Sequence, residues 1–245
     1  MKVVFLGATK GMGRALARLM AERGDRLFLL GRDPDDLRVC ATDLEIVGAS
    51  HDVGVATCDL LRPETFGTAL DQADASLDGF DAVVVTAALF ATQEELEDDQ
   101  DLRDRLLDAN FANTIRFCEE ARTRLLARGG GVLCVFSSVA GERARKPVIF
   151  YGATKAGLSY YLEGLDHKFR SRGLSTILVK PGFVRTSMTA GLKPPPFAAD
   201  PEQVARVALK AIDKGRPAVY APAVWSWVML VIRNLPRWVM RRVEF

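Results

Sequence analysis

The chain has 245 residues, of which 49% are hydrophobic and 26% charged, proportions that exclude a disordered, collagen-like or low-complexity protein. Its 33 basic and 31 acidic residues give a net charge of +2, which does not favour nucleic-acid binding. The four cysteines form no CxxC pair, only two histidines are present, and no leader-like segment opens the chain. We therefore expect a cytoplasmic protein with free thiols and without a metal site.

Short apolar runs alternate along the chain with longer segments of helical pattern. Several runs are apolar on both faces, as in a parallel sheet covered by helices on both sides. The alternation predicts a single doubly wound α/β domain of the Rossmann type with a seven-stranded parallel sheet over residues 1–222, followed by an apolar, then basic, tail over residues 223–245. The expected elements are, in chain order, strand 3–6, helix 14–23, strands 26–30, 53–57 and 82–86, helix 102–128, strand 131–137, helix 151–172, and strands 175–179 and 218–220.

The first expected strand runs into a glycine-rich turn, Gly7-Ala8-Thr9-Lys10-Gly11-Met12-Gly13. Glycines permit a tight turn and let backbone N–H groups approach a pyrophosphate, and the following helix N-terminus favours negative charge. The spacing Gly-x3-Gly-x-Gly at this place predicts a dinucleotide-binding turn, with a plain strand-to-helix turn as the alternative. The expected cofactor-binding residues of the turn are Gly7, Thr9, Lys10, Gly11, Met12 and Gly13.

Arg32 follows the second expected strand, 19 residues after Gly13, where an acidic residue would bind the ribose 2′-hydroxyl of NAD. A guanidinium there suits the 2′-phosphate of NADP, and Lys10 adds a second positive charge. The sequence therefore favours NADP(H). NAD(H) stays the alternative because Asp33 follows directly and because Arg32 and Lys10 could be ordinary solvated cations.

Three polar residues have the spacing of a proton-transfer site. Ser138 is expected to end the fifth strand, and Tyr151 and Lys155 lie at i and i+4 on one face of the next helix. A tyrosine ordinarily has a pKa of about 10, which a nearby ammonium lowers. We expect Tyr151 to transfer a proton, Ser138 to hydrogen-bond the substrate oxygen, and Lys155 to lower the pKa of Tyr151.

With these motifs the chain resembles the short-chain dehydrogenase/reductase family over essentially its whole length. The residues that carry the resemblance are the three glycines of the turn, Asp59-Leu60, Asn110, Ser138, Tyr151-x3-Lys155 and Pro181-Gly182-Phe183-Val184-Arg185-Thr186.

The resemblance implies a role for each of these residues. Asp59 and Leu60 would flank the adenine, Lys155 would also bind the nicotinamide ribose, and Asn110 would hold a water of the proton relay. Family members are often homodimers or homotetramers, which the resemblance implies here too. The segment 181–186 would cover the nicotinamide, with Val184 and Thr186 nearest its carboxamide. Its expected cofactor contacts are Pro181, Gly182, Val184 and Thr186.

The chain departs from the family after the fourth expected strand. There the family has Asn-Asn-Ala-Gly, and this chain has Thr86-Ala87-Ala88-Leu89. We expect backbone contact with the cofactor to persist at Ala87. The departure puts side-chain tethering from this loop in question.

An uncharged run of 16 residues over 217–232 leads into the tail and is too short to span a bilayer. Apolar residues and tryptophans beside basic residues are typical of a segment at a membrane interface. The basic residues here are Arg233, Arg237, Arg241 and Arg242. A buried subunit-contact helix or a substrate lid is the alternative reading of the same composition.

The C-terminal half also resembles the reductases of decaprenylphosphoryl-2-keto-erythro-pentose, which implies a lipid-linked or bulky apolar carbonyl substrate. The matching stretches are Ser137-Ser138-x-Ala140-Gly141-Glu142-Arg143, Tyr151-Gly152-x-Thr154-Lys155-Ala156-Gly157-Leu158, Arg185-Thr186-x-Met188, Ala221-Pro222-Ala223, Val228-Met229, Arg233 and Pro236-Arg237.

The sequence thus predicts an NADP(H)-preferring oxidoreductase that acts on a carbonyl or alcohol, in the cytoplasm or peripherally at a membrane. A lipid-linked keto-sugar is the preferred substrate, and 3-ketoacyl thioesters or small ketones are the enzymatic alternative. A non-catalytic nucleotide-sensing protein is the alternative from another class, against which the intact Ser138, Tyr151 and Lys155 argue. A structural subunit of a membrane complex is a third possibility.

Overall fold

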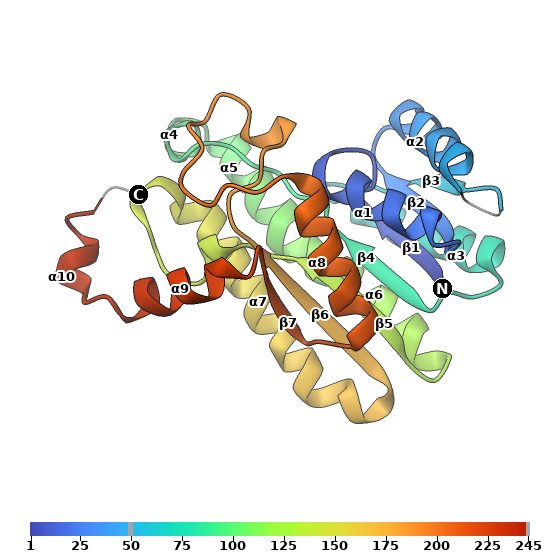
Figure 1. Cartoon of the computed structure of the whole chain (residues 1–245). Coiled ribbons are helices and arrows are strands. Elements are labelled where there is room, and N and C mark those ends of the chain that lie inside the picture. Colours follow the sequence, from blue (N-terminus) through green and yellow to red (C-terminus); the bar gives the residue numbers. More distant parts are fainter. Residues whose placement is uncertain (49–50, 244–245) are drawn as a thin grey trace.

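A seven-stranded parallel sheet forms the centre of the computed structural model, which describes residues 1–48 and 51–243 (Figure 1). The strand order is β3-β2-β1-β4-β5-β6-β7, and each of these neighbouring pairs is parallel. The predicted seven-stranded, doubly wound sheet is confirmed. The strands are β1 Lys2–Leu6, β2 Arg26–Gly31, β3 Gly54–Thr57, β4 Ala82–Val85, β5 Gly131–Phe136, β6 Leu174–Pro181 and β7 Ala218–Ala221.

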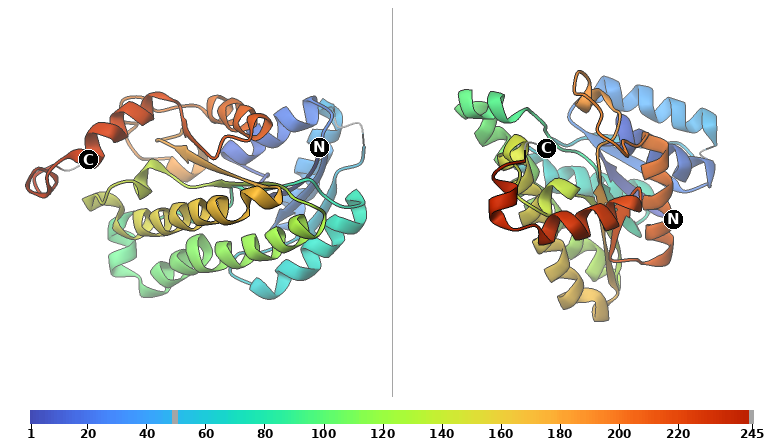
Figure 2. Two further views of the ribbon diagram at one scale, coloured as in Figure 1. Left: turned by 90° about the horizontal axis from the view of Figure 1, so that it is seen from below. Right: turned by 60° about the vertical axis from the view of Figure 1, so that its left-hand side comes forward.

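Helices pack against both faces of the sheet, as the view from below in Figure 2 shows. One face carries α1, α2 and α8, and the other carries α3, α6 and α7. The helices are α1 Gly11–Glu22, α2 Pro34–Val47, α3 Phe66–Leu77, α4 Gln93–Asp98, α5 Gln100–Leu107, α6 Asn113–Ala127, α7 Ile149–Phe169, α8 Pro201–Lys214, α9 Val224–Asn234 and α10 Arg237–Met240.

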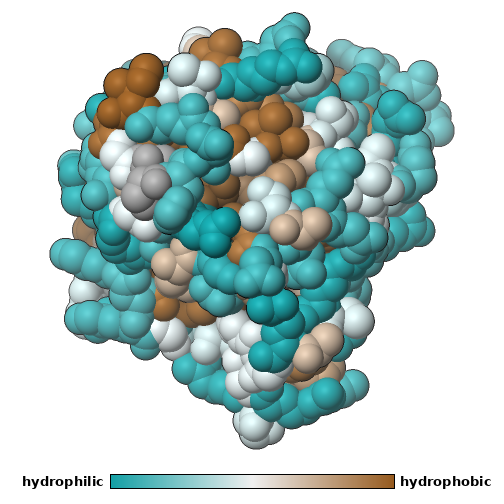
Figure 3. Space-filling model, turned by 90° about the vertical axis from the view of Figure 1, so that its right-hand side faces the viewer, coloured by the Kyte–Doolittle hydropathy of each residue, from teal (hydrophilic) through white to brown (hydrophobic). Residues whose placement is uncertain are grey.

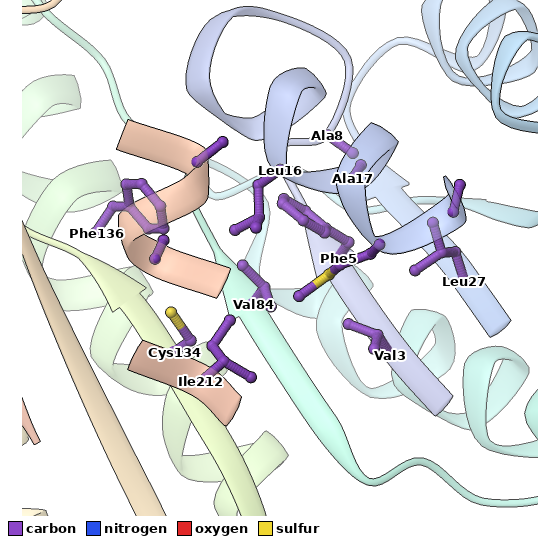
Figure 4. Close-up of a cluster of buried hydrophobic side chains, with 14 of the residues drawn as sticks. Val3, Phe5, Ala8, Leu16, Ala17, Leu27, Val84, Cys134, Phe136 and Ile212 are labelled. Atoms are coloured by element: carbon purple, nitrogen blue, oxygen red, sulfur yellow. The ribbon is translucent and has the colours of Figure 1, made fainter. Parts of the chain in front are cut away.

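The core consists of two large apolar layers, because successive strand residues point to opposite faces of the sheet. Val3 and Phe5 belong to the layer under α1 and α8, part of which Figure 4 shows, and Val4 and Leu6 belong to the layer under α3, α6 and α7. Burial on both faces explains why the strands read as continuous apolar runs.

The helix expected over residues 102–128 is not continuous. It is divided into α5, a π-helical turn Asp108–Ala112 and α6, so one extra residue is accommodated in the middle. Such π-bulges occur frequently at functional sites. Here the turn contains Asn110.

The four cysteines, Cys40, Cys58, Cys118 and Cys134, are buried and unpaired, as expected for core-filling thiols. Hydrophilic residues cover most of the face shown in Figure 3, and hydrophobic residues appear there in separate groups. Within residues 1–48 and 51–243, every helix is too short or too polar to cross a bilayer.

Candidate active site

The carboxyl ends of the parallel strands share one edge of the sheet, and the strand order reverses between β1 and β4. In open α/β sheets, ligands bind outside such a reversal point. The turn after β1, the loop after β4, Ser138 after β5 and the segment after β6 all lie at this edge. The topology therefore gathers the predicted site residues at the place where a dinucleotide binds.

The glycine turn is packed too tightly for larger residues. Gly7 has φ +98°, and a Cβ atom added to Gly13 would lie 2.0 Å from the Gly7 carbonyl oxygen. Helix α1 begins at Gly11, three residues earlier than predicted, so Gly11, Met12 and Gly13 form its first turn. Their N–H groups lack intrahelical acceptors, as at every helix start, and suit a phosphate.

The loop after β4 is tethered by side chains, although it lacks the two asparagines of the family pattern. The Thr86 hydroxyl donates to the carbonyl of Gly7 at 2.9 Å, which joins this loop to the glycine turn. Asn110 donates to the Leu89 carbonyl and accepts from the Leu89 N–H, both at 2.7 Å. The buried Asn110 amide therefore positions the loop; its expected water contact stays a prediction.

The region near Arg32 contains one unpaired cation and one paired cation. Arg32 is exposed, and within the described part of the chain its side chain makes no hydrogen bond or ion pair. The Asp33 carboxylate caps α2 by accepting from the N–H groups of Asp35 and Asp36, which lowers its pKa. Lys10 forms an exposed ion pair with Asp36 at 2.7 Å. Arg32 is thus the available partner for a 2′-phosphate, while Asp33 is engaged by the helix.

Asp59 and Leu60 lie beside the end of β2. The Cys58 N–H donates to the Gly31 carbonyl at 2.8 Å, which brings the residues that follow β3 next to Arg32. The Asp59 carboxylate accepts from the Leu61 N–H at 2.9 Å, and Leu60 is buried. This position is compatible with their expected adenine contacts.

The segment after β6 crosses the glycine turn. A Cβ atom added to Gly11 would lie 3.2 Å from the methyl carbon of Thr186. Buried Val184 forms a β-bridge with Ala199, which holds the segment in place. The segment 181–186 therefore lies close enough to the glycine turn to cover a nicotinamide bound there, as expected.

Tyr151 and Ser138 lie together at the end of β5. The Tyr151 ring packs edge-on against Phe90, with ring centroids 5.2 Å apart. Burial raises the pKa of Tyr151 to about 12, and a hydrogen bond with the Ser138 hydroxyl opposes this rise. Ser138 lies two residues beyond the end of β5, not within the strand as predicted, and its oxygen accepts from the Ala140 N–H at 3.1 Å.

The net pKa shift of Tyr151 is upward, and the predicted lowering by Lys155 stays a prediction. The Lys155 ammonium lies 5.6 Å from the centroid of the Tyr151 ring and donates to the Phe136 carbonyl at 3.0 Å. Burial lowers the pKa of Lys155 to about 8. Both shifts follow from burial, which disfavours the charged form of each group.

A cavity of about 760 Å³ opens in front of Ser138 and Tyr151. Its wall is largely apolar and includes residues of the loop before α7, the segment after β6 and the proline-rich loop before α8. Such a cavity can admit a substrate much larger than a small ketone. Of the glycine turn, only Met12 lines this cavity, which therefore extends away from the expected phosphate site.

The tail forms one wall of this cavity. Trp225, Val228 and Ile232 of α9 and Leu235 after it line the space. The Trp225 indole lies directly over Gly182, where an added Cβ would be 1.9 Å from the indole nitrogen. Helix α9 therefore packs on the segment after β6 and closes one side of the cavity.

Glu142 fastens this wall to the body of the protein. Its carboxylate forms a short ion pair with Lys180, a second with Arg233 of α9 at 3.0 Å, and accepts from the Tyr220 hydroxyl at 3.1 Å. Burial would raise the pKa of Glu142, but the bonds and charges of these partners, Lys180 foremost, lower it. Arg143 adds a hydrogen bond to the Leu235 carbonyl at 2.7 Å.

Glu142→Gln is expected to lower the free energy of unfolding by about 2–3 kcal/mol. Breaking a buried ion pair costs about 3–5 kcal/mol, and the partial exposure of Arg233 reduces this value. Urea denaturation measures the loss, and amide hydrogen exchange should show it first in α9. Glu163→Gln, at an exposed position on α7, is the matched control. Equal stability of the two variants would contradict the role of Glu142.

The sequence analysis missed Phe90, Glu142, Arg145 and Trp225, which contact the cavity or hold its wall. Arg145 and Glu142 lie between Ser138 and Tyr151 in sequence, an interval that could have signalled contact with the substrate. The sequence analysis offered a substrate lid as one reading of the tail, but its composition did not indicate Gly182 as the contact of α9.

The residues at this edge fit a nicotinamide dinucleotide. The tight glycine turn offers N–H groups for phosphates, Arg32 is an exposed cation, and the Lys155 ammonium lies 5.6 Å from the centroid of the Tyr151 ring. Across residues 1–48 and 51–243, no three or more His, Cys, Asp and Glu side chains are grouped to hold a metal ion.

Known proteins are similar to this chain in sequence and in architecture. An uncharacterized oxidoreductase of Mycobacterium tuberculosis is 29% identical over 243 residues, which span 98% of this chain and 96% of the relative. An uncharacterized oxidoreductase of Streptomyces coelicolor is 30% identical over 242 residues, 98% of this chain and 95% of the relative.

A solved short-chain dehydrogenase/reductase from Mycobacterium ulcerans superposes with a TM-score of 0.81 at 21% identity, covering 89% of this chain and 86% of that one. A second, from Mycobacterium marinum, gives 0.80 at 22% identity, covering 89% and 92%. The family model of the short-chain dehydrogenases matches residues 1–196. The chain is therefore an oxidoreductase of the short-chain dehydrogenase family.

Proposed function

We propose that the chain reduces the carbonyl group of a bulky amphiphilic substrate with NADPH. The observation that carries the proposal is the placement of the Tyr151 phenol with Ser138 on the wall of a largely apolar cavity of about 760 Å³. A phenol so placed can act as the general acid that carbonyl reduction requires.

The residues divide the reaction between them. Ser138 holds the carbonyl oxygen, and Tyr151 donates the proton that this oxygen takes up. Lys155 holds the cofactor ribose and stabilises the phenolate that remains. Gly7 to Gly13 bind the pyrophosphate, and Asp59, Leu60, Ala87 and Pro181 to Thr186 surround the rest of the dinucleotide. When bound, the reduced dinucleotide supplies the hydride.

The preferred substrate within this proposal is a keto-sugar on a lipid carrier. The apolar wall formed by α9 and the proline-rich loop supports this choice, because it offers apolar area for a hydrocarbon chain. Each buried CH₂ group contributes about 0.8 kcal/mol. Trp227 and Trp238 of the tail are 72% and 59% exposed and lie near four arginines, which supports peripheral contact with an anionic membrane.

Assembly as a homodimer or homotetramer also belongs to the proposal. Phe111 and Tyr160 are exposed large side chains on the π-turn and on α7, and they support a subunit contact there.

A panel of carbonyl compounds, assayed with NADPH and with NADH, tests the proposed function. It should include polyprenyl-phosphate keto-sugars, 3-ketoacyl thioesters and small ketones. Turnover of the lipid-linked compounds with NADPH is the expected result. Efficient turnover of the thioesters or small ketones alone would favour that substrate class, and no hydride transfer at all would favour a nucleotide-sensing protein.

Arg32→Asp is expected to weaken NADPH binding about 10- to 100-fold, because a hydrogen bond to a charged group contributes about 1.5–3 kcal/mol. NADH binding should change much less, so the ratio of the two affinities reverses. Calorimetric titration measures both constants. Arg38→Asp, at an exposed position on α2, is the control and should shift the ratio less than about threefold. A parent chain that already prefers NADH would contradict this assignment.

A further inference from the structure

Two buried N–H donors on the substrate cavity lack acceptors. Among the described residues, the buried side-chain polar atoms without a hydrogen-bond partner are Arg26 Nε, Arg145 Nε and Trp225 Nε1. Arg145 and Trp225 both line the cavity in front of Tyr151. Buried donors are nearly always paired, so their concentration here indicates a ligand that accepts hydrogen bonds.

Arg145 also lacks a counter-ion. Within residues 1–48 and 51–243 its side chain forms no ion pair, hydrogen bond or ring contact, and burial lowers its pKa. Two other cations, Lys180 and Arg233, are each paired with the carboxylate of Glu142, which they share. The acidic group on the cavity wall is Glu94, which is exposed, and a second cation, Lys193, is exposed as well.

We propose that Arg145, assisted by Trp225, binds an oxyanion carried by the carbonyl substrate, and that Arg145 thereby selects anionic over neutral amphiphiles. A carboxylate and a phosphate share the required chemistry, since a guanidinium binds both through paired N–H donors. The inference rests on the proposed function, because it takes this cavity as the substrate site.

The cofactor phosphates do not explain the two donors. Of the glycine turn only Met12 reaches this cavity, and Arg32 lies outside it. The remaining wall, with Val148, Val228 and Ile232, is apolar. The fitting substrate is therefore an amphiphile that carries a carbonyl, an apolar part and a separate anionic group.

Three matched substrates test the selection: a medium-chain oxo-acid, its methyl ester and the corresponding oxoalkyl phosphate. The ratio of kcat/KM for each anion to kcat/KM for the ester is measured in the parent, Arg145→Met, Trp225→Phe and Lys193→Met. We expect Arg145→Met to lower the ratio about 10- to 100-fold and Trp225→Phe to lower it less. Lys193→Met should change the ratio less than about threefold, because solvent screens an exposed charge.

A binding measurement separates this inference from the proposed function. Decanoate or decyl phosphate should raise the Tm of the parent and raise that of Arg145→Met much less. If carbonyl compounds are not reduced but this difference holds, the anion site stands and the proposed function fails. If carbonyls are reduced but the ester serves as well as the anions, or Arg145→Met keeps the parent's ratio, the anion site is wrong. A ratio lowered by Lys193→Met alone would also overturn it.

Discussion

Tyr151→Phe is expected to lower turnover about 100- to 10,000-fold while cofactor affinity stays nearly unchanged, because only the transferable proton is removed. The structure predicts that the fold tolerates the change. The ring that packs edge-on against Phe90 remains, and the hydroxyl contributes a hydrogen bond with Ser138 alone. Single-turnover kinetics with saturating NADPH measure the chemical step directly.

The control for this variant is on the same helix. Tyr160 is 83% exposed on α7, so Tyr160→Phe should turn over like the parent. Turnover of Tyr151→Phe within about threefold of the parent would remove Tyr151 from the mechanism.

Lys155→Met should stabilise the chain by about 1–3 kcal/mol at pH 7 and abolish most of its activity. Burial lowers the Lys155 pKa from about 10.4 to about 8, and since one pKa unit corresponds to about 1.4 kcal/mol, the buried charge costs about 3 kcal/mol. Loss of the hydrogen bond to the Phe136 carbonyl offsets part of the gain.

The pH dependence of the stability difference shows whether the buried charge of Lys155 causes it. Below pH 8, Lys155 is protonated in both the folded and the unfolded chain, so the folded parent bears the full cost of the charge. Between about pH 8 and 10.4 only the unfolded chain holds the proton, and the parent's stability rises with pH. The advantage of Lys155→Met should therefore shrink across this interval.

Urea denaturation at several pH values tests this prediction, with Lys210→Met at an exposed site on α8 as the control. The control should show no such change. A lower stability of Lys155→Met below pH 8 would show that Lys155 contributes to stability instead of costing it.

The sheet was predictable because its signal is local. Strands buried on both faces are continuous apolar runs, and the glycine turn marks the start of the first helix. The position of Asn110 was harder to predict from the sequence. The π-turn that contains it adds one residue to a helix without altering the helix's composition. Helical periodicity alone predicted an unbroken helix over residues 102–128.

The chemistry of the site was only partly predictable. Spacing placed Tyr151 and Lys155 on one helix face, but the depth at which they are buried depends on the packed chain. That depth reverses the expected pKa shift of Tyr151. The packing of the tail was equally hard to predict, because its composition fits a membrane surface. In the structure Arg233 contacts Glu142 and Trp225 contacts Gly182, and each partner is more than 40 residues away in sequence.

The wall formed by α9 places one part of the cavity lining apart from the proton-transfer residues along the chain. The family match covers residues 1–196, which contain Ser138, Tyr151 and Lys155, whereas Trp225, Val228, Ile232 and Leu235 follow it. Exchanging this last helix between relatives would thus alter the range of accepted molecules without replacing a proton-transfer residue. For an engineer, the cavity-facing positions of α9 are therefore places to vary while Ser138, Tyr151 and Lys155 stay unchanged.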